Sequence, residues 1–212
     1  MHDNGGVANG GVDTSAPQTF VIAVTAVNDA PVFAKGADQT VLAYSGQRTV
    51  NGWATNISAG PPDESGQGLD FIVTTDNKGL FSALPTIDVA TGNLTFTPAP
   101  NTVGVATVSI QLHDDGGTDN GGVDTSAVQT FTIAVTANST GFLPPLSQNI
   151  YFALGRTIPI KFQLTGANGS LVTSMSAVQS ITVSGSEGTF TPPPAAGSTG
   201  WRNDGSQYIY NW

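Results

Sequence analysis

Oxygen-bearing side chains gather in the turn-rich stretches of this sequence, in a pattern that suits a calcium ion. Calcium takes about six to eight oxygen ligands, mainly carboxylates and carbonyls, and tolerates irregular geometry. The candidates lie in three segments, and they are Asn28 and Asp29, Asp63 and Glu64, and Asp114, Asp115, Asp119 and Asp124. The alternative interpretation is that they are solvated turn formers, because Asp and Asn are favoured at turns for backbone reasons alone.

The second candidate chemistry involves histidine. There are only two histidines, His2 and His113, and each directly precedes an Asp. Beside Asp114 and Asp115, the imidazole of His113 would serve as a general base next to a metal-polarised carbonyl. That site would make the protein a calcium-dependent hydrolase of small esters or lactones, such as N-acyl-homoserine lactones. The alternative is an ordinary surface histidine, since alternation places His113 on the solvent face of its strand.

Other catalytic signatures are absent from the sequence. It has no His-Glu-x-x-His pair, no Gly-x-Ser-x-Gly elbow and no glycine loop in the strand-to-helix context that phosphate binding needs. Trp53, Trp201 and Trp212 offer stacking faces for sugars, so a carbohydrate-binding module is a further hypothesis. The competing interpretation is that these residues are core, as is usual for tryptophan in a small sandwich.

Composition limits the fold that must position these groups. Of 212 residues, 26 are Gly and 13 are Pro, whereas Lys and Arg together number six and 10% of residues are charged. Glycine and proline interrupt the sequence too often for long helices, and the chain is too apolar to be disordered. We therefore expect an all-β protein. The net charge of −9 argues against nucleic acid or anionic membrane surfaces as partners.

The absence of cysteine excludes disulfides and cysteine-bound metals. No apolar run reaches the ~20 residues of a membrane-spanning helix, so we expect no membrane insertion. The first residues show neither the basic start nor the apolar core of a signal peptide.

An internal repeat organises the chain. Residues 2–26 align without gaps on residues 113–137, with 20 of 25 positions identical at an offset of 111. A full domain's length of strand-like sequence precedes the second copy, and only Met1 precedes the first. We therefore expect 1–27 to be the end of a truncated repeat and 28–137 to be a complete domain, followed by a linker at 138–148 and a partial β-domain at 149–212.

Hydrophobic alternation predicts the strands. In the complete unit they are expected at 39–43, 49–55, 69–75, 80–82 with 87–90, 93–97, 105–112 and 129–136. One buried row is predicted to contain Phe131, Ile133 and Val135, and its counterpart in the first copy is Phe20, Ile22 and Val24. Short strands separated by turn residues are typical of an immunoglobulin-like sandwich. In the last unit we expect strands at 157–164, 178–183 and 208–212.

Two family resemblances follow from these motifs. Residues 26–33, Ala-Val-Asn-Asp-Ala-Pro-Val-Phe, resemble the linker of cadherin-like repeats, and 114–126 is similar to the last hairpin of bacterial cadherin-like tandem-repeat surface proteins. Residues 157–164, with Pro-Ile-Lys-Phe at their centre, resemble the PxKF domain at the end of such extracellular arrays. The resemblance implies small β-sandwiches, an extracellular or cell-surface location, a structural or adhesive function, and calcium bound between domains by Asn28, Asp29, Asp63 and Glu64.

The first-copy strand predicts an association. Residues 18–25 carry an apolar row with no parent sheet of their own in this chain, and burying each large side chain is worth about 1.5–3 kcal/mol. Such a strand is expected to join a sheet, for example in a homo-oligomer formed by strand exchange. A cell-surface or polysaccharide partner is the other expectation, and it follows from the adhesive resemblance.

Overall fold

The computed structural model describes residues 1–144, 159–178, 183–185, 188–190 and 200–211. Within these residues the protein is all-β, as predicted, and every helical segment is a 3-10 turn of three residues. These turns are η1 (Ala8–Gly10), η2 (Pro62–Glu64), η3 (Lys78–Leu80), η4 (Asp119–Gly121) and η5 (Met175–Ala177). No helix in the described ranges has the length and hydropathy that a membrane span requires.

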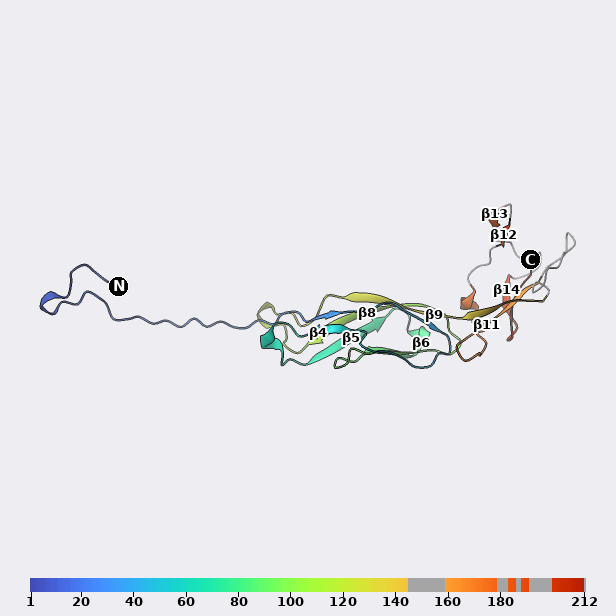
Figure 1. The fold of residues 1–212 in the computed structure, drawn as a ribbon, viewed down its shortest axis with the longest axis horizontal. Helices are drawn as coiled ribbons and strands as arrows, with labels where there is room; N and C mark the ends of the chain where they lie inside the picture. Colours follow the sequence, from blue (N-terminus) through green and yellow to red (C-terminus); the bar gives the residue numbers. More distant parts are fainter. Residues whose placement is uncertain (145–158, 179–182, 186–187, 191–199, 212) are drawn as a thin grey trace.

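Two sheets form the central sandwich (Figure 1). The larger sheet has the order β2-β9-β8-β5, and its strands are β2 (Gln39–Leu42), β9 (Gln129–Thr136), β8 (Gly104–Asp114) and β5 (Leu69–Thr75). The smaller sheet contains β3 (Arg48–Val50), β7 (Leu94–Pro98) and β6 (Phe81–Ile87) in that order. Strand β2 runs parallel to β9, whereas β8 is antiparallel to both β9 and β5.

Two features at the sandwich edge differ from the sequence prediction. The strand predicted at 49–55 is interrupted, because Gly52 adopts a φ of 59° and turns the chain after β3. Trp53 then enters the core and donates its indole N–H to the carbonyl of Ala37 at 2.9 Å. The second feature, which alternation did not predict, is a pairing of β1 (Val32–Ala34) with β4 (Thr55–Ser58).

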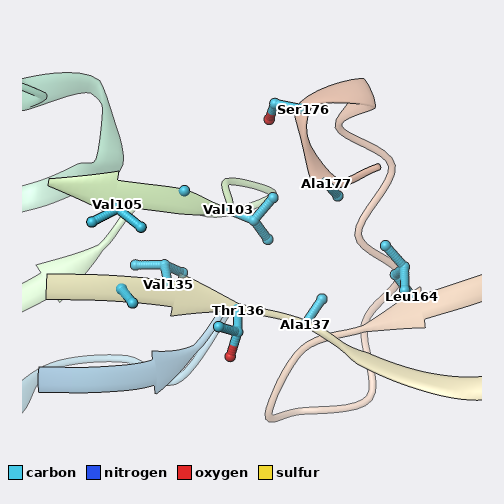
Figure 2. Close-up of a pocket in the computed structure, with 10 residues that line it drawn as sticks. Val103, Val105, Val135, Thr136, Ala137, Leu164, Ser176 and Ala177 are labelled. Atoms are coloured by element: carbon cyan, nitrogen blue, oxygen red, sulfur yellow. The ribbon is translucent and has the colours of Figure 1, made fainter. Parts of the chain in front are cut away.

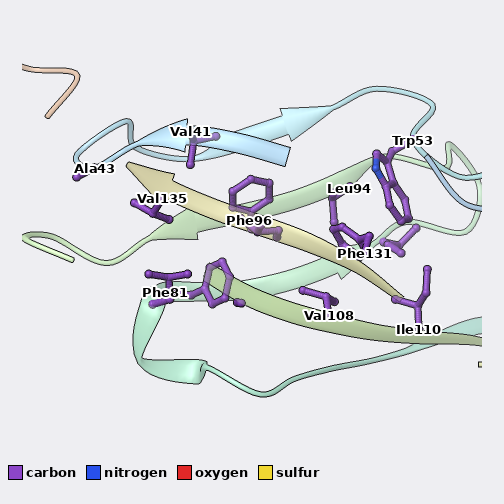
Figure 3. Packing of buried hydrophobic residues seen from close by; sticks show 14 of the residues in the cluster. Val41, Ala43, Trp53, Phe81, Leu94, Phe96, Val108, Ile110, Phe131 and Val135 are labelled. Atoms are coloured by element: carbon purple, nitrogen blue, oxygen red, sulfur yellow. The ribbon is translucent and has the colours of Figure 1, made fainter. Parts of the chain in front are cut away.

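Alternation along β8 and β9 builds the core. The inward rows of these strands are almost completely buried, and they comprise Ala106, Val108, Ile110, Leu112, Phe131, Ile133 and Val135. They pack against Leu94 and Phe96 of the smaller sheet in one cluster (Figure 3). The ring of Trp53 lies 4.4 Å from that of Phe131, centroid to centroid. The buried row predicted for the second copy is therefore confirmed, and Trp53 is core rather than a sugar platform.

The C-terminal unit contains a sheet of order β10-β11-β15-β14 and a hairpin. The strands are β10 (Asn138–Leu143), β11 (Pro159–Thr165), β15 (Tyr208–Asn211) and β14 (Trp201–Asn203), with β12 (Val183–Gly185) and β13 (Gly188–Phe190) in the hairpin. The strand predicted at 157–164 corresponds to β11. The expected linker, 138–148, contains β10, which pairs with β11 directly after β9 ends. The strand predicted at 178–183 lies mostly outside the described residues, as does Trp212.

This unit packs against the end of the sandwich away from the Asn28 linker (Figure 1). Ala167 donates its N–H to the carbonyl of Ala43 at 2.8 Å, and the hydroxyl of Tyr44 donates to the carbonyl of Leu171 at 3.2 Å. Asn101 accepts from the N–H of Thr173 at 2.6 Å. Leu164, Val172 and Tyr208 extend the apolar cluster of the sandwich across this junction.

The two copies of the repeat share their hairpin but not their strand. The bridge His2↔Thr14 matches His113↔Thr125, and η1 matches η4 at the same offset. In contrast, residues 16–27 form no strand and extend away from the sandwich (Figure 1). Phe20, Ile22 and Val24 are 83%, 74% and 89% exposed. The buried row predicted for the first copy is thus wrong for this structure, because no sheet lies against it.

Equivalent substitutions in the two copies should therefore have unequal effects. We expect Ile133→Ala to lower the free energy of unfolding by about 2–5 kcal/mol, because it opens a cavity at a fully buried position. Ile22→Ala, at the matched but exposed position, should leave the free energy of unfolding of the monomer unchanged within about 0.5 kcal/mol when measured at low protein concentration. Chemical denaturation of both variants measures this difference, and equal losses would contradict the structure.

Candidate functional site

The side chain of Asn28 joins three segments at one end of the sandwich. Its Nδ2 donates to Oδ1 of Asp114 at 2.8 Å and to the carbonyl of Val123 at 2.9 Å. Its Oδ1 accepts from Nε2 of Gln67 at 2.7 Å. The backbone carbonyl of Asn28 also accepts from the N–H of Val123 at 3.0 Å. The linker is thereby fixed to the hairpin after β8 and to the loop before β5.

Glu64 attaches the next residue of the linker to the η2 turn. Its Oε1 accepts from the backbone N–H of Asp29 at 2.8 Å, and the residue is only 8% exposed. Consecutive prolines at positions 61 and 62 start the 3-10 turn that carries this carboxylate inward. Gly60 allows the close approach, because a Cβ at that position would overlap Oε2 of Glu64. The loop is therefore shaped to bury a carboxylate beside the linker.

Asp114 is the most buried acid of the group, with no exposed surface. It ends β8 on the same inward row as Leu112, and its Oδ1 accepts from Asn28 and from the N–H of Gly116 at 3.0 Å. A Cβ at Gly116 would overlap the Oδ1 of Asn28, so only glycine fits there. Asp115 is exposed, and its Oδ1 accepts from the N–H of Gly68 at 2.8 Å.

Three buried oxygens at this end have no hydrogen-bond partner. They are Oε2 of Glu64, Oδ2 of Asp114 and Oε1 of Gln67. Leaving a buried charged oxygen without a partner is costly, so such groups normally carry a compensating donor or cation. Two carboxylates and an amide carbonyl are the hard oxygen donors that calcium prefers. The chemistry of these donors fits calcium. The described residues contain no group of three or more His, Cys, Asp or Glu side chains that could hold a metal ion, so an amide or carbonyl oxygen would have to complete the site.

The other predicted ligands lie outside this buried group. Asp63 and Asp119 are exposed, on η2 and η4 respectively. Asp124 contributes its backbone carbonyl, which accepts from the N–H of Asp114 at 2.9 Å. The structure thus brings the side chain of Asn28 against Asp114 and the backbone of Asp29 against Glu64, whereas the side chains of Asp29 and Asp115 are exposed. Gln67 was missed by the sequence prediction, because a single Gln in a glycine-rich loop gives no signal before the loop is folded.

His113 is held between two carboxylates. Its Nδ1 lies 2.7 Å from Oδ1 of Asp70, and its Nε2 lies 4.0 Å from Oδ2 of Asp124. The hydrogen bond that the imidazole donates to Asp70 is the main cause that raises the pKa of His113 above its ordinary value. Desolvation opposes this shift, and the charges of Asp70, Asp124 and Asp114 add smaller contributions to it. The contact at Nδ1 suits an ion pair between His113 and Asp70, and Asp124 is too far from Nε2 for a hydrogen bond.

The cavity at the junction with the C-terminal unit contains no ionisable side chain. This shallow cavity of about 310 Å³ is lined by Val103–Val105, Ala134–Ala137, Leu164, Ser176 and Ala177 (Figure 2). None of these side chains titrates near neutral pH. Trp201 packs on the rings of Phe162 and Tyr210 at 5.3 and 4.8 Å, so it supports the C-terminal sheet. No observation among the described residues favours the hydrolase or the sugar-binding hypothesis.

Comparisons with known proteins add no assignment. No protein-family model matches the chain, and no curated protein matches it. Among solved structures, the chain is similar to a protein from Bacteroides fragilis NCTC 9343 assigned as an alpha-galactosidase, at 13% identity with a TM-score of 0.29. The match covers 53% of this chain and 19% of that one. A similarity this weak supports no inference about fold or function.

The environment of His113 predicts its titration. We expect NMR to give a pKa above 6.5 for His113 and to show that Asp70→Asn lowers it, because the largest stabilising contact of the imidazolium is lost. The contribution of this pair to stability should be fully present below the unfolded-state pKa and should disappear as pH rises through the folded-state pKa. The effect on stability should be small, since both partners are partly exposed. A wild-type pKa at or below 6.5 would contradict this geometry.

Proposed function

We propose that this protein is a calcium-stabilised structural or adhesive module of a bacterial cell-surface or secreted repeat protein. The observation that carries the proposal is the pair of buried carboxylate oxygens, on Glu64 and Asp114, that lack hydrogen-bond partners next to the Asn28–Asp29 linker. The resemblance to cadherin-like repeats adds the expectation that such a linker binds calcium. An extracellular location agrees with this chemistry, because extracellular modules commonly bind calcium with Kd values of about 10⁻⁴–10⁻³ M.

Calcium would act here as a staple between the linker and the sandwich. The ligands would come from Glu64 and Asp114, with Gln67 adding a carbonyl and Asp29 and Asp115 lying next to them. The ion would neutralise two carboxylates that this end of the sandwich buries without partners. It would also fix the direction in which the segment before Asn28 leaves the sandwich. A module of this kind transmits force and sets spacing, and it needs no catalytic group.

The protein should gain stability from calcium. At a calcium concentration of about 100 times Kd, a site present only in the folded state stabilises by about 2.7 kcal/mol. For a cooperative unit of about 110 to 210 residues, this corresponds to a rise in Tm of roughly 5–12 °C. Calorimetry in calcium and in chelator measures the change. An identical Tm in both conditions would exclude the proposal.

Conservative variants identify the ligands. Asp114→Asn keeps the acceptor for Asn28 and Gly116 but replaces the unpartnered charged oxygen, so it should abolish most of the calcium-dependent rise in Tm. Glu64→Gln should do the same. Asp63→Asn, which changes the exposed neighbour in the same loop, should leave most of the rise intact. If Asp63→Asn removed the calcium response while Glu64→Gln retained it, the ligand assignment in this loop would be wrong.

A further inference from the structure

The most exposed apolar surface of the described residues lies in the extended segment at 18–25. Its Phe20, Ile22 and Val24 occupy alternate positions, and all three side chains are exposed. Residues 14–27 contain no charged side chain, although the whole protein carries a net charge of −9. No charge on the segment itself therefore opposes its contact with an apolar surface, and the only electrostatic repulsion comes from the net charge of the two molecules.

The second copy of the repeat shows that this sequence forms a strand when a sheet is available. In the second copy the same row is Phe131, Ile133 and Val135, buried in a sheet. The five positions that differ between copies correspond to 115, 118, 119, 128 and 132, and none of them is buried. Every side chain that the sandwich buries in this stretch is thus unchanged in residues 2–26. The first copy retains the full capacity to act as a sandwich strand.

The sandwich has one open side that fits an added strand. Strand β5 is an edge of the larger sheet, and its inward residues Leu69, Phe71 and Val73 are only half-buried. A groove of about 510 Å³ lies between β5 and β6, which we call the β5–β6 groove. Its lining comprises Leu69–Phe71, Val73 and Leu84–Val89. Leu84 is itself 46% exposed.

The other edges of the sandwich are poorer acceptors. Strands β2 and β3 have four and three residues, too short for an eight-residue partner. Strand β6 contains Pro85 and two irregularities of register against β7. In contrast, β5 has seven residues in unbroken register with β8. A regular edge of this length supports strand addition through its backbone groups.

We infer that residues 18–25 of one copy add to the β5 edge of a second copy, with Phe20, Ile22 and Val24 facing the β5–β6 groove. Exchange with β9 of the second copy would be less favourable, because burial of this row would expose the equivalent row of β9. Addition at the β5 edge buries Phe20, Ile22 and Val24 without exposing any side chain of the second copy. The segment leaves its own sandwich at the end opposite the C-terminal unit, so it is presented to another molecule (Figure 1).

This contact joins different surfaces of the two copies. Such a heterologous contact generates open chains of molecules rather than a closed dimer, unless the rotation closes a ring. Each copy carries the same net charge, so added salt should strengthen the association by screening repulsion. An assembly held by ion pairs would instead weaken with salt.

Sedimentation velocity of the full chain over a range of concentrations tests the inference. The wild type should show species that grow with concentration and with salt. Ile22→Asp should abolish these larger species, because it places a charge in the apolar row. Leu84→Asp should abolish them as well, because it places a charge in the β5–β6 groove that receives this row. Val21→Asp is the matched control, since Val21 alternates with the row, and it should retain assembly. Monomers at all concentrations would overturn the inference, as would equal effects of Val21→Asp and Ile22→Asp or normal assembly of Leu84→Asp.

Hydrogen exchange provides an independent measurement. The amides of residues 18–25 should become protected as concentration rises, together with those of β5. Protection that does not depend on concentration would mean that the segment folds back on its own sandwich, and would overturn the inference. Both measurements are repeated in chelator, so that a failure of the calcium site and a failure of strand addition give separate results.

Discussion

The hydrogen bond between the side chains of Asn28 and Asp114 is the contact on which the linker end of the molecule depends. It brings the chain entering the sandwich against the end of β8, which is the strand at the centre of the core. Gln67 and Val123 then bind the same Asn28 side chain from the two neighbouring loops. Gly116 completes the arrangement, because any larger residue would displace the Asn28 amide.

The two ends of the sandwich contact their neighbouring segments through different kinds of interaction. At the C-terminal end the contact is apolar and continuous with the core, and it is supported by backbone and Asn101 hydrogen bonds. At the linker end the contact is polar and contains buried oxygens without partners. The protein thus combines an apolar junction at one end of the sandwich with a polar junction at the other.

Local signals predicted a large part of the fold. Alternation along 105–112 and 129–136 gave the inward rows correctly, because a strand has a side-chain period of two. It failed at 49–55, where the positive φ of Gly52 and the burial of Trp53 depend on contacts with distant residues. For the candidate site, Asp114 and Glu64 were among the predicted ligands, but their burial was invisible in a sequence where Asp63 and Asp115 look equivalent. Gln67 was not predicted, since it becomes relevant only when its loop meets Asn28.

The repeat separates what local sequence decides from what the tertiary structure decides. The sequence alone determines the hairpin, since Asn9 and Asn120 adopt φ angles of 55° and 57° in the two copies whether or not a sandwich surrounds them. It also determines the all-β class and the apolar rows, because these follow from residue type and alternation. Only the tertiary structure decides whether a row is buried, and Ile22 and Ile133 differ in that alone. Burial requires a partner surface, and a strand cannot encode in its own residues whether that surface is present.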